Sequence, residues 1–535
     1  MRLKLFKPRD LLALLAICLI GFLLPFIWGR KGFIIFDFSL IVDGGWRIIN
    51  GELPHINYIM PSGPAIFYVQ ALFYLIFGAN LYAVLLHTSL FNALASGVGF
   101  YVVRTQSSFI YASVAGLLTS VWFYLPFSFP WFDTLAFFFV LLAFVIYELS
   151  LYRNPKSKGV YSFLIGVLLA FAFFSKQNIG GFALVIFALL LFVRVGFRGW
   201  KQILLYLLGF LSVFACYATF IWTQGAWERF VDSFFVRPAL LGRVGRLFDF
   251  SRWVNFIFRW PQIMLVISLA IITCHGFILR HKRKIHNFID LVALLVLSEL
   301  AAFTGDASKW MFFPYIGIVL CLYLYRYLGT APSQAKKAMS RQKEKTLSLK
   351  TTISYLILFA LFLFLFIQGL EMGTSRRVGS YCFARQGYDF SYDLKTLKFR
   401  PFKMDRQFGP ELDLIVERAK TLIKPEEKVF IFPNAYLLYM ALDKVSPQVF
   451  SWFHPGHSLF NQLGDDKRLV QSLQDTKPEW MIFDKKNQIH EPHSVRGMFA
   501  YLPKLLTFVE ENYFLFGETD GYLILRLKEE QTQKR

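Results

Sequence analysis

The chain has 535 residues, of which 56% are hydrophobic and 19% aromatic, and its mean hydropathy is +0.47. Such a composition is typical of a polytopic membrane protein and excludes a string of ordinary soluble domains. Its 57 lysines and arginines outnumber the 35 acids, giving a net charge of +22. These basic residues form short clusters between apolar runs, so orientation in a membrane explains them better than binding to nucleic acid.

About eleven apolar stretches are candidates for membrane-spanning helices, since roughly 20 helical residues cross the hydrocarbon core. They run over residues 11–28, 82–103, 109–125, 132–148, 160–174, 179–193, 202–222, 261–279, 288–303, 310–328 and 352–370. A further apolar stretch, Pro64 to Phe77, would extend about 21 Å as a helix and is too short to span. We predict that it lies along the membrane interface.

Eleven spans place every strongly basic connection on one side of the membrane. These connections are the N-terminus and the segments around residues 153–158, 194–201, 280–284 and 336–350. The positive-inside bias makes that side cytoplasmic. We expect the membrane to be the cell's inner, or plasma, membrane. The outer side then receives residues 29–81, which we call the first loop, together with the turn at Lys176, the loop 223–260, the connection 305–309 and the C-terminal part.

Residues 372–535 have ordinary polarity and are predicted to form a soluble extracytoplasmic α/β domain, separate from a membrane domain of residues 1–371. Residues 428–432, 479–483 and 522–527 are predicted strands, and residues 410–422 and 498–512 are predicted helices. The first of these strands continues into PNAYLLYM rather than into a glycine-rich turn. Nucleotide binding at this domain is therefore not expected.

The first loop contains two aspartates that are candidates for catalysis, Asp37 and Asp43. Arg47 follows Asp43 by four residues, so a helical ion pair is as good an interpretation of Asp43 as a catalytic role. Asp37 stands in the apolar sequence GFIIFDFSL without such a neighbour, which favours a functional role. Six residues separate the two acids, so one helix would present them on different faces and one base is the simpler hypothesis.

Other polar residues predicted to face outward are candidate substrate ligands. They are His55, Asp133, Lys176, Gln177, Arg243, Arg246 and Lys309. Asp133 is equally interpretable as a helix cap. The loop 223–260 holds six arginines, and arginine side chains suit the phosphate of a lipid headgroup, although a loop resting on anionic lipids would look the same. No cluster of His, Cys and acidic residues predicts a metal site, so we expect no cofactor.

Several motifs of the membrane part resemble a known family. They are WRIINGELPH at residues 46–55, PSGPAIFY at 61–68, LIFG at 75–78 and SKQNIG at 175–180. They are similar to the first loop and an outer turn of the GT-C integral membrane glycosyltransferases, and closest in form to the family 39-like and RgtA/B/C/D-like bacterial proteins. The resemblance implies a GT-C-like helical fold and a donor sugar linked to polyprenyl phosphate. Counted back from Gly51, it implies Asp37 as the catalytic base, with Asp43 as second choice, while many relatives have Asp where this chain has Asn57.

The chemistry expected from these residues is transfer of a sugar to a hydroxyl of a lipid, glycan or protein acceptor. An outer-loop Asp would accept the hydroxyl proton as the oxygen attacks the anomeric carbon, and outward cations would stabilise the departing phosphate. Membrane lipids are the other expected partners. The alternatives are an O-antigen polymerase or ligase, which the arginine-rich loop favours, a transporter of lipid-linked saccharides, and a non-catalytic membrane scaffold.

Overall fold

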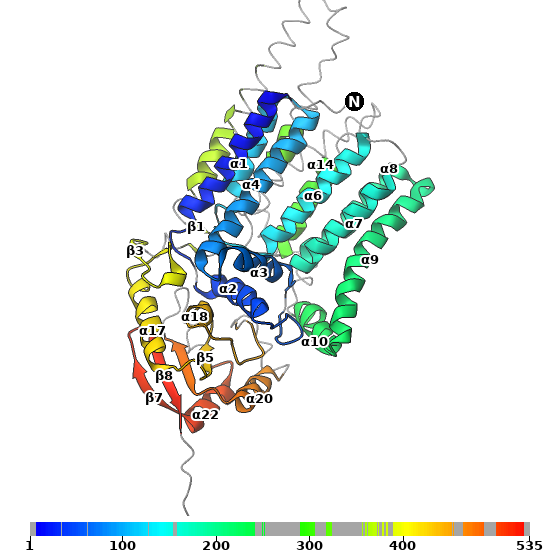
Figure 1. The fold of residues 1–535 in the computed structure, drawn as a ribbon. Helices are drawn as coiled ribbons and strands as arrows, with labels where there is room; N and C mark the ends of the chain where they lie inside the picture. Colours follow the sequence, from blue (N-terminus) through cyan, green and yellow to red (C-terminus); the bar gives the residue numbers. More distant parts are fainter. Residues whose placement is uncertain are drawn as a thin grey trace, which may run out of the picture.

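A bundle of long helices carries a small α/β domain at one end in the computed structural model (Figure 1). The structure describes residues 7–33, 35–60, 62–126, 128–152, 158–240, 289–304, 317–323, 389–451, 464–485 and 499–528, with further positions at 249, 251 and 453 and scattered between 352 and 382. The predicted span 261–279 and most of the span 310–328 lie outside the described residues.

Within the part of the chain that the structure describes, eight helices of the bundle coincide with predicted spans. They are α1 (Pro8–Trp28), α4 (Leu81–Gln106), α5 (Phe109–Trp122), α6 (Phe132–Tyr152), α7 (Lys158–Ser175), α8 (Gln177–Val195), α9 (Trp200–Thr223) and α14 (Ile289–Thr304). Among the described residues, α1, α4, α6, α8 and α9 are long and apolar enough to cross a membrane. The protein is therefore a multi-pass membrane protein with a mostly helical fold.

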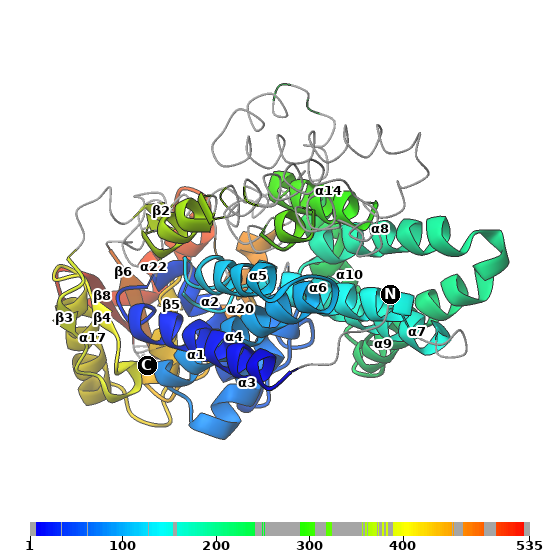
Figure 2. The same cartoon turned by 90° about the horizontal axis from the view of Figure 1, so that it is seen from above.

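Close helix packing accounts for the arrangement of the bundle seen from above (Figure 2). Helix α1 packs on α4 and α5, and α7 packs between α6 and α9. A Cβ atom at Gly166 would lie 2.0 Å from the Tyr206 carbonyl oxygen, and one at Gly209 would lie 2.1 Å from that of Phe163. Glycine on both helices thus allows α7 and α9 to approach closely, as is common between helices in lipid.

Helices α2 (Ile35–Ile49) and α3 (Ala65–Phe77) of the first loop lie across one end of the bundle, which we call the loop end (Figure 1). The short apolar helix predicted there is α3. The turn between the two helices packs on the end of α7, since a Cβ atom at Gly63 would lie 1.9 Å from the Phe174 carbonyl oxygen. The loop after α9 is not simply irregular, because it forms α10 (Trp227–Val231), the π-helical η3 (Asp232–Val236) and α11 (Arg237–Leu240).

The C-terminal domain, residues 389–528, also lies at the loop end (Figure 1). Its sheet has the order β5-β6-β8-β7, with β5 (Val429–Phe432) parallel to β6 (Trp480–Asp484), and β8 (Tyr522–Leu527) antiparallel to both β6 and β7 (Tyr513–Glu518). The helices are α17 (Gly409–Leu422), α18 (Leu437–Ala441), α20 (Asp465–Thr476) and α22 (Pro503–Asn512), and β3 (Tyr392–Asp393) pairs with β4 (Lys403–Met404). The three predicted strands and two predicted helices are confirmed, whereas β7 and α20 were not predicted.

Candidate active site

Asp37 lies in the first turn of α2 and is 1% exposed. Beside it, the Phe38 ring packs on Phe33, with ring centroids 4.6 Å apart, and on Phe129 of the α5–α6 connection at 5.6 Å. Phe402 of the C-terminal domain meets both Phe33 and Phe38. The apolar sequence around Asp37 therefore joins three parts of the chain through Phe33 and Phe38, and Asp37 is a buried residue next to Phe38 in the sequence.

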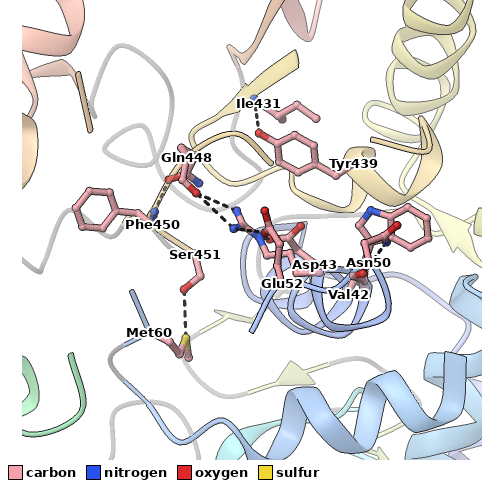
Figure 3. A network of polar contacts seen from close by, with 12 residues as sticks. Val42, Asp43, Asn50, Glu52, Met60, Ile431, Tyr439, Gln448, Phe450 and Ser451 are labelled. Atoms are coloured by element: carbon pink, nitrogen blue, oxygen red, sulfur yellow. Dashed lines mark hydrogen bonds and ion pairs between the residues drawn. The ribbon is translucent and has the colours of Figure 1, made fainter. Parts of the chain in front are cut away.

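Asp43 lies further along α2 and forms the ion pair with Arg47 that the spacing predicts (Figure 3). The Arg47 Nε atom donates to the Asp43 carboxylate at 2.8 Å, and its Nη1 atom donates to Glu52 at 3.1 Å. Both Nη atoms reach the backbone carbonyl of Gln448 in the C-terminal domain, at 3.4 and 3.3 Å. The side chains of Asp43 and Arg47 are each 1% exposed, so this network is shielded from solvent.

Burial raises the pKa of Asp43 to about 6, although the charge of Arg47 and its hydrogen bond act to lower the pKa. The second carboxylate oxygen, Oδ1, has no hydrogen-bond partner among the described residues. Asp43 thus combines a perturbed carboxylate with an ion pair, so its geometry alone fits both a structural and a catalytic role.

Lys176 and Asp133 form an ion pair at the loop end, with the Nζ atom 3.2 Å from the carboxylate. Lys176 precedes α8 and Asp133 lies in the first turn of α6, and both side chains are largely buried. The ammonium group also lies 5.9 Å from the ring centroid of Phe132. The lysine that the sequence identifies as the cation of a short turn is therefore held in place by the neighbouring candidate, Asp133.

His55 and Gln177 meet at η3. The His55 Nδ1 atom lies 2.7 Å from the hydroxyl of Ser233, and the Gln177 amide donates to the Phe234 carbonyl at 3.2 Å. His55 is fully buried against the rings of Phe230 and Phe234, and burial lowers its pKa to about 3. The imidazole is therefore neutral at physiological pH, and its Nε2 atom has no hydrogen-bond partner among the described residues.

The arginine-rich loop contributes contacts to protein groups in its described portion. Arg237 pairs with Asp232 on its own segment and with Asp465 at the start of α20, and Arg229 donates to the Ile56 carbonyl. The phosphate-binding interpretation has no support at Arg237, because two carboxylates already occupy its guanidinium. Arg243, Arg246 and Lys309 lie outside the described residues.

Aromatic contacts through α3 link two of the charged pairs. The Arg47 guanidinium lies 4.7 Å from the centroid of the Tyr58 ring, Tyr58 contacts Phe67, and Phe67 contacts Phe132 beside Asp133. Arg47 with Asp43 and Lys176 with Asp133 thus occupy one contiguous region at the loop end. No group of three His, Cys, Asp or Glu side chains within the described ranges is arranged to hold a metal ion.

Comparisons with known proteins give a family match and similar solved structures. Residues 61–222 match the family model described as dolichyl-phosphate-mannose-protein mannosyltransferase. The crystal structure of apo ArnT from Cupriavidus metallidurans is similar over 96% of this chain and 97% of its own, with a TM-score of 0.52 at 12% identity. ArnT bound to undecaprenyl phosphate gives 0.50 at 11% identity over the same shares. The archaeal oligosaccharyltransferase AglB from Archaeoglobus fulgidus gives 0.45 at 13% identity, covering 96% and 74%.

The comparison with curated proteins gives no significant match. The fold is similar to that of ArnT, and the match over residues 61–222 supports the resemblance to the GT-C glycosyltransferases that the sequence motifs indicate. The matched region contains α3 to α9, including Asp133, Lys176 and Gln177, whereas Asp37, Asp43 and His55 precede it.

Proposed function

We propose that this protein is a membrane glycosyltransferase that moves a sugar from a polyprenyl-phosphate donor to a hydroxyl group of a lipid, glycan or protein. The observation that carries the proposal is the match of residues 61–222 with a family of transferases whose donor is a dolichyl-phosphate sugar. The similar structure of ArnT with undecaprenyl phosphate bound supports a lipid phosphate as the carrier here.

Asp37 is our candidate for the general base. It is the first-loop acid that best matches the motif position, and it is buried. The next residue, Phe38, contacts the α5–α6 connection and the C-terminal domain. The carboxylate would accept the proton of the acceptor hydroxyl while the hydroxyl oxygen forms a bond to the anomeric carbon. The bond between that carbon and the phosphate oxygen breaks in the same step.

Lys176 is our candidate cation for the departing polyprenyl phosphate. The phosphodiester of the donor carries one negative charge, and a second develops on the phosphate as the sugar leaves. An ammonium group held in a largely buried place stabilises such charge more than a solvated one does. Asp133 fixes the position of Lys176 by the ion pair at 3.2 Å. Gln177, next to Lys176, and His55 are further candidate ligands, joined through η3.

We place this reaction on the outer face of the cytoplasmic membrane. The N-terminus of α1 and the basic connection before α9 lie at the end of the bundle opposite the first loop (Figure 1). The positive-inside bias assigns that basic end to the cytoplasm. The first loop and the C-terminal domain then face outward, where flipped polyprenyl-linked sugars would be accessible.

The experiment is an assay of the purified full-length protein in lipid nanodiscs with polyprenyl-phosphate sugars and a membrane-lipid extract as acceptor source, measuring released polyprenyl phosphate. Asp37→Asn is expected to slow release by about 10²- to 10⁴-fold, the usual contribution of a general base. Asp520→Asn, at an exposed position of the C-terminal domain, is the matched control and should turn over like the wild type. Undiminished release by Asp37→Asn would refute the assignment of the base.

A further inference from the structure

We propose that Asp43 and Arg47 are positioning residues that dock the C-terminal domain onto helix α2 and so hold Asp37 in place for transfer. This inference rests on the proposed function in assigning the chemistry to Asp37. It separates the roles of the two aspartates, which the sequence leaves open, and makes the C-terminal domain a working part of the active site.

Arg47 is the first element of this docking. Its guanidinium donates hydrogen bonds to Asp43 on α2, to Glu52 three residues beyond that helix, and to the Gln448 carbonyl of the C-terminal domain (Figure 3). A buried guanidinium needs compensating partners, since an uncompensated buried charge is strongly destabilising. Separation of the domain would remove the Gln448 carbonyl, so the ion pair on α2 favours the docked arrangement.

Backbone pairing extends the contact on both sides of Arg47. The Trp46 Nε1 atom donates to the Lys444 carbonyl at 2.6 Å, and the Ile59 amide donates to the Val449 carbonyl at 2.6 Å. The Ser451 hydroxyl returns a hydrogen bond to the Ile59 carbonyl at 3.0 Å. Residues 449–451 therefore lie along the first loop as an added strand segment, a mode of contact whose main-chain bonds fix register.

Asp43 is enclosed by this interface. Helix α2 packs on α18. The charge of Asp43 helps to raise the pKa of two buried phenols there, those of Tyr436, the N-cap of α18, and of Tyr439 within α18. The same charge helps to raise the pKa of Tyr58 in the first loop and of Tyr74 in α3. An acid that is paired with a buried arginine and packed between α2 and the C-terminal domain is suited to hold two surfaces together.

The helix transmits this constraint to Asp37. Six residues correspond to a rotation of about 240°, so Asp37 projects from a face roughly 120° away from that of Asp43. Fixing Asp43 and Arg47 against the C-terminal domain sets the rotation of α2 about its axis. That rotation in turn sets the direction of the Asp37 carboxylate, and a small misplacement of a reacting group costs rate steeply.

A second contact supplies a way to hold the domain independently of Arg47. Lys31 lies opposite Lys403 in an isolated parallel bridge, with the Gly32 amide donating to the Lys403 carbonyl and the Lys403 amide to that of Arg30, both at 2.7 Å. Neighbouring strands lie about 4.8 Å apart, within the Cα separation that a disulfide requires. The pair Lys31→Cys/Lys403→Cys, with the five native cysteines replaced, can therefore tether the domain.

The test measures docking and transfer separately in the full chain. Hydrogen exchange of residues 56–60 and 448–451 reports docking, and release of polyprenyl phosphate reports transfer. We expect Asp43→Asn and Arg47→Lys to raise exchange in both segments by about tenfold, the equivalent of one buried hydrogen bond, and to lower kcat by at least that factor. The oxidised Lys31→Cys/Lys403→Cys disulfide should return kcat to within about threefold of the tethered wild type, and reduction should abolish the rescue.

Asp37→Asn provides the contrast, because it should lose transfer with exchange unchanged and should gain nothing from the disulfide. The double variant Asp43→Leu/Arg47→Met removes both charges of the ion pair, so neither residue remains as an uncompensated buried charge. Exchange should still rise in this variant, because the hydrogen bond from Arg47 to the C-terminal domain is lost. Transfer lost in Asp43→Asn at wild-type exchange would overturn the proposal and favour Asp43 in the chemistry. Raised exchange with normal transfer, or an oxidised tether that restores nothing, would overturn it as well. If the wild type transfers no sugar, the proposed function fails, and exchange alone then decides the docking claim.

Discussion

Polar side chains are used differently in the helix bundle and at the loop end. Within the bundle, Asn92 of α4 donates to the carbonyls of Gly21 and Ser120 and accepts from the Tyr124 amide, so one side chain ties three neighbouring segments. At the loop end, Arg47 reaches Gln448, 401 residues away, and Arg237 reaches Asp465, 228 residues away. The bundle polar groups secure helices that lipid already confines, whereas those at the loop end hold together parts that would otherwise separate.

The difference has a consequence for function. Apolar burial in the bundle is spread over many residues, so single changes there are tolerated more readily. The loop end holds the buried ion pairs of Arg47 with Asp43 and of Lys176 with Asp133, and both pairs contain candidate site residues. Stability and activity should therefore be coupled more tightly at the loop end than in the bundle.

Removal of Arg47 should have the largest effect. Arg47→Met leaves Asp43 and Glu52 facing each other without the cation and should lower the free energy of unfolding by about 3–5 kcal/mol. The change is measured by chemical denaturation in detergent. Arg104→Met, which breaks the bundle ion pair with Asp10 at the opposite end, is the matched variant. Its effect should be smaller, because Asp10 also accepts from the Lys7 amide, and an equal loss in both would remove the distinction between the regions.

Loss of the Lys176 charge should come next. Lys176→Met is expected to slow transfer by about 10²-fold, the usual effect of removing one group that stabilises developing charge. Lys176→Arg keeps the positive charge and should retain most of the wild-type rate. Initial rates over a range of donor concentrations give the measurement. Lys201→Met is the control and should leave the rates unchanged, because Lys201 lies at the start of α9, at the end of the bundle opposite the loop end. Equal rates for Lys176→Met and the wild type would exclude Lys176 from phosphate binding.

Acidification should weaken the loop end through His55. Its pKa is lowered from 6.5 to about 3 in the folded protein, so the unfolded chain binds a proton between these values while the folded chain does not. Stability from this group is complete above pH 6.5 and falls as the pH drops, by about 1.4 kcal/mol for each unit well below 6.5. Unfolding midpoints at pH 7.5 and 5.5 should differ less in His55→Gln. An identical pH dependence in the variant would contradict the buried neutral imidazole.

Weakening the contact between Arg237 and α20 should have the smallest effect. Asp465→Asn leaves Arg237 its second partner, Asp232, so we expect a loss of about 1 kcal/mol. Arg468→Met removes an exposed arginine from the same cluster and should change stability by less than about 0.5 kcal/mol. Denaturation of both variants beside the wild type gives the comparison, and a larger loss in Arg468→Met would show that burial is not what makes the cluster matter.

Patterns local to the sequence predicted most of the elements. Apolar runs identified the bundle helices, and the spacing of Asp43 and Arg47 identified their ion pair. Helix α20 carries a signal that could have been found, since Leu469 and Leu473 are buried four residues apart behind acidic residues at its start. Strand β7 begins directly where α22 ends, and Phe514, Leu515 and Phe516 are all exposed, so no alternation or turn marks it.

Long-range pairs could not be predicted in this way. Asp133 and Lys176 form an ion pair although two helices of the bundle separate them in the sequence. From the sequence alone, Asp133 is equally interpretable as a helix cap and Lys176 as a solvated residue of a turn. The partner of Arg47 in the C-terminal domain is the backbone carbonyl of Gln448, which carries no residue-specific signal at all. The part of the site that depends on tertiary contact is therefore visible only in the folded structure.

That the first loop and the C-terminal domain face outward is tested most directly by labelling the two ends of α9. In a cysteine-free background, Gln224→Cys and Lys201→Cys place one exposed thiol just beyond the loop end and one at the opposite end. A membrane-impermeant maleimide applied to intact cells should modify Gln224→Cys, and should modify Lys201→Cys only after permeabilisation. The reverse pattern would place Asp37 on the cytoplasmic side and contradict transfer at the outer face.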